Sequence, residues 1–148
     1  MSDLRHHPPR RWSERIDGIC WLPRLIDKAR AHDAGTLGHY FFGQSPVDAD
    51  LLKAGRIGYD DVLEAARSAP DDAGVLAFLE ARSPGAGDRM RAWTANPGLI
   101  DRFTFALVDA DEGYTTGPFA TIVRALPGDA IAEFLRKVLP CKVKPTPT

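Results

Sequence analysis

The sequence predicts an all-α protein, an irregular orthogonal bundle of about six short helices. Apolar residues recur at helical spacing in several segments, and we find no alternating run of the β type joined by a hairpin dipeptide. Thirteen glycines and 12 prolines divide the chain into short segments. Because 148 residues suit one hydrophobic core, we assign residues 1–148 to a single helical domain.

The first predicted elements are an arm and a helix. Residues 1–19 have no sustained period, so we expect an arm that lies over the domain and is anchored by Trp12. A helix is predicted from Leu22, because Pro23 suits a first turn and Gly35 suits an end. One face carries the apolar stripe Leu22, Leu25, Ile26 and Ala29, and the other carries Arg24, Asp27, Lys28 and Arg30, where Asp27 partly neutralises the two arginines.

The middle of the chain predicts further short helices and one apolar helix. Residues 99–110 are apolar on most sides, which favours a helix that is enclosed by its neighbours at the centre of the core. Before this segment, helical spacing and Gly/Pro boundaries predict short helices at 48–54, 59–69 and 71–82 and around Met90 and Trp93.

The C-terminal part is predicted to extend the core. Residues 119–126 fit either a short extended segment or a helix, whereas residues 129–139 show clean helical spacing. We therefore divide the domain into a core at 20–113, an extension with a helix at 114–139 and a disordered tail at 140–148.

Composition and charge exclude several classes of protein. The chain is 44% hydrophobic and 26% charged, with a net charge of -1, so we expect no specific nucleic-acid binding. It has neither an apolar leader nor a run near the ~18 apolar residues of a membrane span, which predicts a cytoplasmic protein that binds no membrane. Cys20 and Cys141 are far apart and belong to no C-x-x-C pair, so both are interpreted as structural or incidental thiols.

The motif search assigns no metal, cofactor or catalytic residue. The acidic run at 109–113 does not continue as a calcium loop, because Tyr114 and Ala120 stand where the loop needs Gly and Glu. His32 and His39 lack the two further ligands that zinc requires. Phosphate-loop and nucleophile-elbow motifs are also missing.

The arginine content indicates where a ligand could bind. The chain has 14 Arg and 5 Lys, and a guanidinium forms a planar fork for carboxylate or phosphate groups. Cations of the 22–34 helix, joined by Arg10 or Arg11 and by the aromatic turn after Gly35, predict an anion pocket; the alternative is ordinary ion pairing. The candidate binding residues are Arg24, Asp27, Lys28, Arg30, His39 and Tyr40.

Three blocks of sequence resemble a known family. They are Trp-Leu-Pro-Arg-Leu-Ile-Asp-Lys-Ala-Arg at 21–30, Gly-Thr-Leu-Gly-His-Tyr at 35–40 and Asp-Ala-Asp-Glu-Gly at 109–113. Together they are similar to the recurring blocks of a family of small bacterial proteins that is classed as a domain of unknown function, over roughly residues 3–113. The resemblance implies a mostly helical cytoplasmic domain and brings no activity, cofactor or catalytic residue.

These observations lead to three functional hypotheses. The first is a non-enzymatic binding module for a protein partner or a small anionic ligand, since the densest charge grouping adjoins a glycine-punctuated aromatic turn. The alternative is an acid/base or metal-assisted enzyme that uses Asp27, His32, His39 and Tyr40. The third is a homo-oligomer, such as a homodimer, in which a second copy covers the last helix through Ile131, Phe134, Leu135 and Val138.

Overall fold

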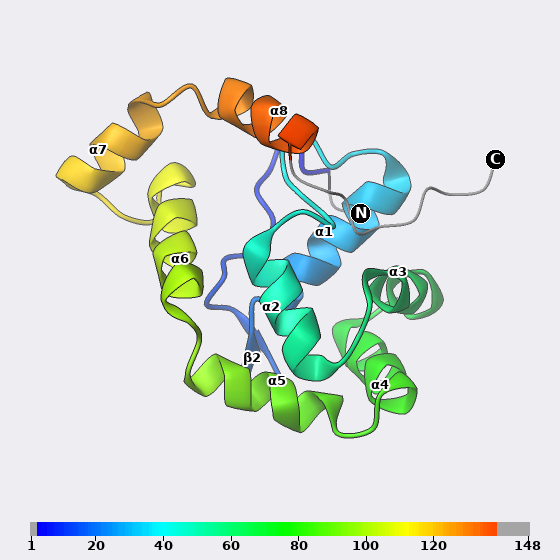
Figure 1. The fold of residues 1–148 in the computed structure, drawn as a ribbon. Helices are drawn as coiled ribbons and strands as arrows, with labels where there is room; N and C mark the ends of the chain where they lie inside the picture. The colour runs from blue at the N-terminus through cyan, green and yellow to red at the C-terminus, as the bar shows by residue number, and fades with distance from the viewer. Residues whose placement is uncertain (1–2, 139–148) are drawn as a thin grey trace.

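The computed structural model describes residues 3–138, and these residues form eight helices and one antiparallel hairpin (Figure 1). The tail predicted at 140–148 and the last residue of the helix predicted at 129–139 lie outside the described residues. The elements are β1 (Arg15–Ile16), β2 (Ile19–Cys20), α1 (Leu22–Ala34), α2 (Pro46–Gly55), α3 (Tyr59–Ser68), α4 (Asp72–Arg82), α5 (Ala86–Ala95), α6 (Leu99–Asp111), α7 (Pro118–Ala125) and α8 (Gly128–Val138).

The predicted helical class is confirmed, but the count of about six helices is too low, and one assignment that the sequence left open is resolved. Residues 119–126, which the sequence left between strand and helix, lie almost entirely in α7. Pro118 occupies the first turn, where its missing N–H costs nothing, and Ala120 and Val123 pack against α6. Within residues 3–138, no helix has the length and apolarity needed to cross a membrane.

A short hairpin is the feature that the sequence analysis missed. The strands β1 and β2 pair antiparallel, with Ile16 opposite Ile19. Asp17 and Gly18 between them have φ angles of 48° and 78°, and two successive positive φ values are typical of the two-residue turn that Asp-Gly favours. Strands of two residues are too short to show an alternating pattern, so the dipeptide was the one available signal.

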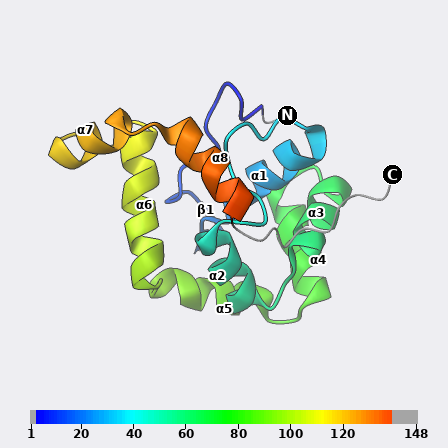
Figure 2. The same cartoon turned by 45° about the horizontal axis from the view of Figure 1, so that its top comes forward.

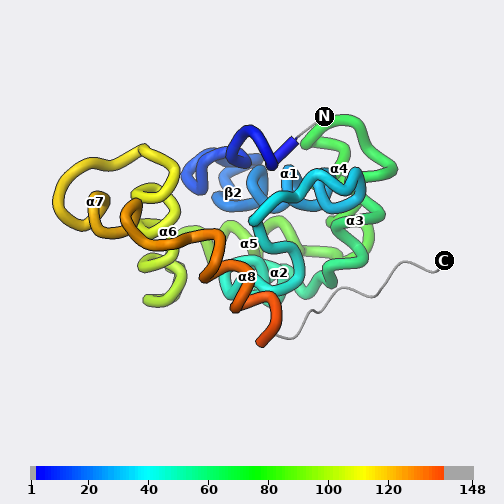
Figure 3. Tube along the Cα trace, turned by 90° about the horizontal axis from the view of Figure 1, so that it is seen from above, coloured from blue at the N-terminus to red at the C-terminus, as the bar shows by residue number. Residues whose placement is uncertain are grey.

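The helices differ from the predicted orthogonal bundle in their arrangement. In all three views α7 lies at the opposite end of the molecule from α3 and α4 (Figures 1, 2 and 3). Helices α5 to α8 follow one another as an arc along the edge of the fold, and α8 passes back over the region of α1 and α2 (Figure 2). Helices α5 and α6 still contribute Ala86, Met90 and Phe105 to the main core, whereas the described residues of α7 and α8 add none to it.

Helix α1 is the centre of the core. It begins after Trp21, which has a left-handed backbone (φ 66°), and ends at Gly35 (φ 72°), so the predicted start and end are confirmed. Residues 21–29 are all buried. The expected charged outer face is therefore wrong: Arg24 and Lys28 are only 2% and 3% exposed, because α2, α3, the N-terminal arm and the end of α6 cover that face.

The N-terminal arm is anchored as the sequence predicts. The Trp12 ring stacks on the ring of Phe105 with centroids 4.3 Å apart, and its indole nitrogen donates to Asp109 at 2.9 Å. This contact ties the arm to α6.

Helix α6 is less enclosed than its apolar sequence predicts. Phe105 enters the core, but Leu99, Ile100 and Phe103 are more than half exposed. Helix α6 lies at the edge of the fold, so only one side has helices to pack against (Figure 1). The centre of the core is α1 rather than α6.

Candidate ligand-binding cavity

A cavity of about 720 Å³ lies between α1, the loop that precedes α2, and the α6–α8 region. Trp21, Arg24 and Lys28 contribute to it from the start of α1. The loop adds its own set of residues, and the C-terminal helices add mainly apolar ones. The loop residues used below are His39, Tyr40, Phe41 and Ser45, and those of the C-terminal region are Glu112, Val123, Leu126, Ile131 and Leu135.

Arg24 lines this cavity and contacts one carboxylate and two aromatic rings. Its two terminal nitrogens donate to the two carboxylate oxygens of Glu112 at 3.0 and 2.6 Å, a bidentate fork. The guanidinium also lies 5.2 Å from the centroid of the Trp21 ring and 5.5 Å from that of Tyr40. Its Nε donor is buried and has no acceptor among residues 3–138. Both terminal nitrogens are paired, and Nη1 also donates to the carbonyl of Arg10 at 3.3 Å.

Lys28 forms the second buried pair, one turn further along α1. Its Nζ lies 2.7 Å from both carboxylate oxygens of Asp48, and the Trp21 indole donates to the same carboxylate at 2.7 Å. Burial lowers the pKa of Lys28, and the charge of Asp48 opposes that shift. The carboxylate of Asp48 therefore holds the lysine and the tryptophan that line the cavity.

Tyr40 and His39 form the side of the cavity that faces α8. Burial raises the pKa of Tyr40, and the negative charge of Glu112 raises it further, so the phenol stays protonated and donates to Glu112 at 3.3 Å. The His39 ring stacks on Tyr40 with centroids 4.6 Å apart, and its Nδ1 lies 3.9 Å from a carboxylate oxygen of Asp129.

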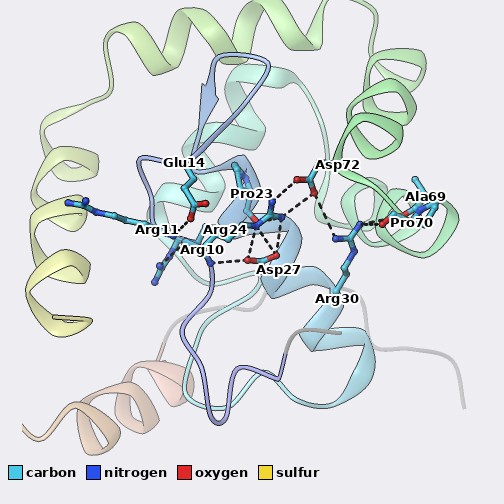
Figure 4. Close-up of polar contacts among 10 residues, drawn as sticks. All are labelled: Arg10, Arg11, Glu14, Pro23, Arg24, Asp27, Arg30, Ala69, Pro70 and Asp72. Atoms are coloured by element: carbon cyan, nitrogen blue, oxygen red, sulfur yellow. Dashed lines mark hydrogen bonds and ion pairs between the residues drawn. The ribbon is translucent and has the colours of Figure 1, made fainter. Parts of the chain in front are cut away.

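Two predicted binding residues, Asp27 and Arg30, lie in a separate network outside the residues that line the cavity (Figure 4). Asp27 accepts from the backbone and guanidinium of Arg10, which also bridges to Asp72 at 2.5 and 3.1 Å. Arg10 holds the pKa of Asp72 below its usual value. Arg30 points to the carbonyls of residues 69 and 70 and lies 3.9 Å from Asp72.

The grouping of α1 cations with Arg10 or Arg11 is therefore corrected. Arg10 binds the Asp27 and Asp72 carboxylates, while Arg11 binds Asp109 at 3.0 and 2.9 Å. These cations do not converge with Arg24, because each has its own carboxylate partner. They join the arm to α1, α4 and α6.

The structure also separates the residues of the enzyme alternative. His39 and Tyr40 line the cavity, whereas Asp27 and His32 do not. The His32 ring instead lies 5.2 Å from that of Phe42. In the part of the chain that the structure describes, no group of three or more His, Cys, Asp or Glu side chains is placed to hold a metal ion.

Sequence reasoning missed Asp48 and Glu112 as members of the site. A signal for a partner was present, because Lys28 and Arg24 interrupt a stretch that is otherwise typical of a buried helix. Nothing in the sequence says which carboxylate each cation meets. The partners lie 20 and 88 residues away along the chain.

The comparison with protein families matches residues 6–97 to the domain of unknown function DUF5069. The chain belongs to this family. No curated protein matches the chain significantly. The DUF5069 segment includes residues 21–30 and 35–40 and ends before residues 109–113, so the match does not reach the acidic block.

The boundary of the DUF5069 match divides the cavity. Trp21, Arg24, Lys28 and Tyr40 belong to the matched segment, and so does Asp48. Residue 112 and helices α7 and α8 lie beyond it. The cations and aromatic rings of the cavity thus come from the family domain, whereas the Glu112 carboxylate and the apolar cover come from the following segment.

Proposed function

We propose that this DUF5069 protein is a non-enzymatic binding module for a small ligand that carries one anionic group on an apolar body. The observation that supports this is the cavity of about 720 Å³, with a buried guanidinium on one side and apolar helix faces on the other. This volume lies within the range of about 300–1,000 Å³ typical of small-molecule sites.

The anionic group is argued from the donors around Arg24. The Arg24 guanidinium and the Tyr40 hydroxyl belong to residues that line the cavity, and both groups can donate to an oxyanion. Lys28 contributes less, because Asp48 is fully buried and already holds its ammonium with two short hydrogen bonds. Arg24 is therefore the anchoring residue of the proposed site.

The apolar body is argued from the opposite side of the cavity. Val123, Leu126, Ile131 and Leu135 line it from α7, the following residue and α8. Leu126 and Ile131 are 50% and 41% exposed, so the apolar body of a bound ligand would cover apolar surface that the protein leaves open. Burial of such surface is the main favourable term in binding an apolar group.

The test uses ligands that separate the two requirements. Octanoate and dodecanoate should raise the melting temperature and give a dissociation constant by calorimetry, whereas octanol and octylammonium should bind at least tenfold more weakly. Arg24→Lys keeps the charge but loses the fork, and it should weaken octanoate binding at least tenfold. Arg67→Lys is the matched control, since Arg67 is half exposed and pairs with Asp33. Equal binding of the four ligands, or undiminished binding by the folded Arg24→Lys protein, would refute the proposal.

A further inference from the structure

The anion position on Arg24 already contains a carboxylate of the same chain. Glu112 accepts from both terminal nitrogens of Arg24, and its Oε1 also lies 3.3 Å from the Tyr40 hydroxyl. The two charged side chains are only 3% and 4% exposed. A ligand carboxylate would need this same fork, so Glu112 shows both the geometry of the site and the group that occupies it.

The backbone that carries Glu112 stands at a helix end. Glu112 is the residue after α6, and a carboxylate there is opposed by the helix dipole. Gly113 follows with a φ of 86°, and residues 113–119 are all exposed. The exposed segment is tied back at two points, because the N–H of Tyr114 donates to the carbonyl of Asp109 and Arg124 donates to the carbonyl of Thr115. The Glu112 side chain itself is held by Arg24 and Tyr40.

Among the described residues, the contacts that hold α8, the cover above the cavity, to the loop before α2 are mainly polar. Asp129 of α8 lies beside His39, and the Arg136 guanidinium lies over the Phe41 ring. Arg136 of α8 donates to the carbonyls of Gly38 and Tyr40, and Gln44 donates to the carbonyl of Arg136. Ala132 is the one buried side chain described in α8. A polar strap of this kind can separate from the loop without opening the core around α1.

From these observations we infer that Glu112 is an internal competitor for the ligand site. The inference rests on the proposed function: a ligand monocarboxylate exchanges with Glu112 on Arg24, and its aliphatic chain takes the space below α8. Exchange is favoured over addition, because a second carboxylate beside Glu112 would place two like charges in a buried site. Ligand binding is thereby coupled to release of the end of α6.

The competition explains why the ligand needs an apolar body. A tethered carboxylate acts at a high effective concentration, in the millimolar range for short flexible connections. A free short carboxylate cannot overcome it at micromolar concentration, whereas each buried methylene raises affinity about three- to fourfold. Dodecanoate should consequently bind more tightly than octanoate, and acetate should not bind measurably to the unmodified chain.

The decisive experiment neutralises Glu112 without changing its shape. Glu112→Gln removes the competing charge and should raise the affinity for octanoate at least tenfold in calorimetry. Glu133→Gln makes the same chemical change on α8 at a side chain that is 72% exposed, and it should change the affinity less than twofold. Unchanged or weaker octanoate binding by Glu112→Gln, with binding still weakened at least tenfold by Arg24→Lys, overturns the inference and leaves the proposed function standing.

Two further measurements cover a variant that folds poorly. Glu112→Ala leaves Arg24 buried without its carboxylate, so millimolar propionate should raise the melting temperature of this variant and leave that of the unmodified chain unchanged. In the unmodified chain, octanoate should speed hydrogen exchange of the amides of residues 110–117 while slowing exchange in α1. Failure of propionate to restore the variant, or slower exchange at residues 110–117 on binding, contradicts the exchange of carboxylates.

Discussion

Removal of the charge on Lys28 should expose the cost of a buried ion pair. In the variant Lys28→Met the side-chain volume is nearly kept, but Asp48 loses two hydrogen bonds of 2.7 Å. The Asp48 carboxylate is 0% exposed, and the Trp21 indole is the other side-chain donor described for it. A buried charge that loses its partner costs about 3–5 kcal/mol, a large share of the roughly 5–15 kcal/mol that holds a domain together.

Urea unfolding at pH 7, followed by circular dichroism, measures this cost. With an m value of about 2 kcal/mol per molar urea, the midpoint of Lys28→Met should fall by roughly 2 M. Asp48→Asn should cost a similar amount, and the double variant should cost at least about 2 kcal/mol less than the sum of the two. Arg67→Met breaks the exposed pair with Asp33 and should cost less than about 1 kcal/mol.

The double-variant cycle decides whether the reasoning holds. If the losses from Lys28→Met and Asp48→Asn add within about 0.5 kcal/mol, the two groups do not depend on each other. A loss below about 1 kcal/mol for Lys28→Met would show that the ammonium is hydrated rather than buried. Either result would refute the interpretation of this pair as a buried, mutually dependent contact.

Two more predictions concern the edges of the core. Burial, and after it the nearby Asp50, raises the pKa of Asp101 to about 6. The folded state therefore binds a proton more tightly than the unfolded state, and the stability that this proton contributes is lost as the pH rises from about 4 through 6. In urea unfolding, Asp101→Asn should therefore raise the free energy of unfolding by about 1–2 kcal/mol at pH 7.5 and by much less at pH 4.5, and an equal gain at both pH values would contradict this. Trp12→Ala should lower the free energy of unfolding by about 2–3 kcal/mol, because it removes both the stack on Phe105 and the hydrogen bond to Asp109. Trp12→Phe keeps the stack and should cost about 1 kcal/mol. Equal losses of stability in thermal unfolding of the two variants would show that the stack does not anchor the arm.

Local features of the fold were predictable where the signal is local. Pro23 and Gly35 mark α1 because one suits a first helical turn and the other a left-handed end. Trp12 was identifiable as an anchor because a large aromatic ring in an otherwise aperiodic arm has much apolar surface to bury. The hairpin at Asp17 and Gly18 was missed, since strands of two residues leave no period to detect.

Four of the six predicted binding residues line the cavity, and the other two, Asp27 and Arg30, do not. Arg24, Lys28, His39 and Tyr40 line the cavity as a group, although the sequence placed the two cations on a face that the fold buries. The carboxylates that hold the two cations, Glu112 and Asp48, lie far from them in the sequence and were not predicted. Asp27 lies on the charged face of α1, but it binds Arg10 of the N-terminal arm and does not line the cavity.

Self-association through α8 remains a proposal, and the four apolar residues on which it rests fall into two groups in the structure. Phe134 and Val138 are more than half exposed, while Ile131 and Leu135 line the cavity. The same stripe thus faces both the proposed ligand and the solvent. Analytical ultracentrifugation of the full chain would show whether a second copy covers the exposed part.

By itself the sequence determined the helical class, the bounds of α1 and the presence of cations next to an aromatic turn. These properties follow from the order of neighbouring residues, through periodicity, capping and glycine geometry. Only the tertiary structure decided that Glu112 meets Arg24 and that Asp48 meets Lys28. Charge pairing depends on which surfaces the packing of apolar faces brings together, and the sequence does not display that packing in its local pattern.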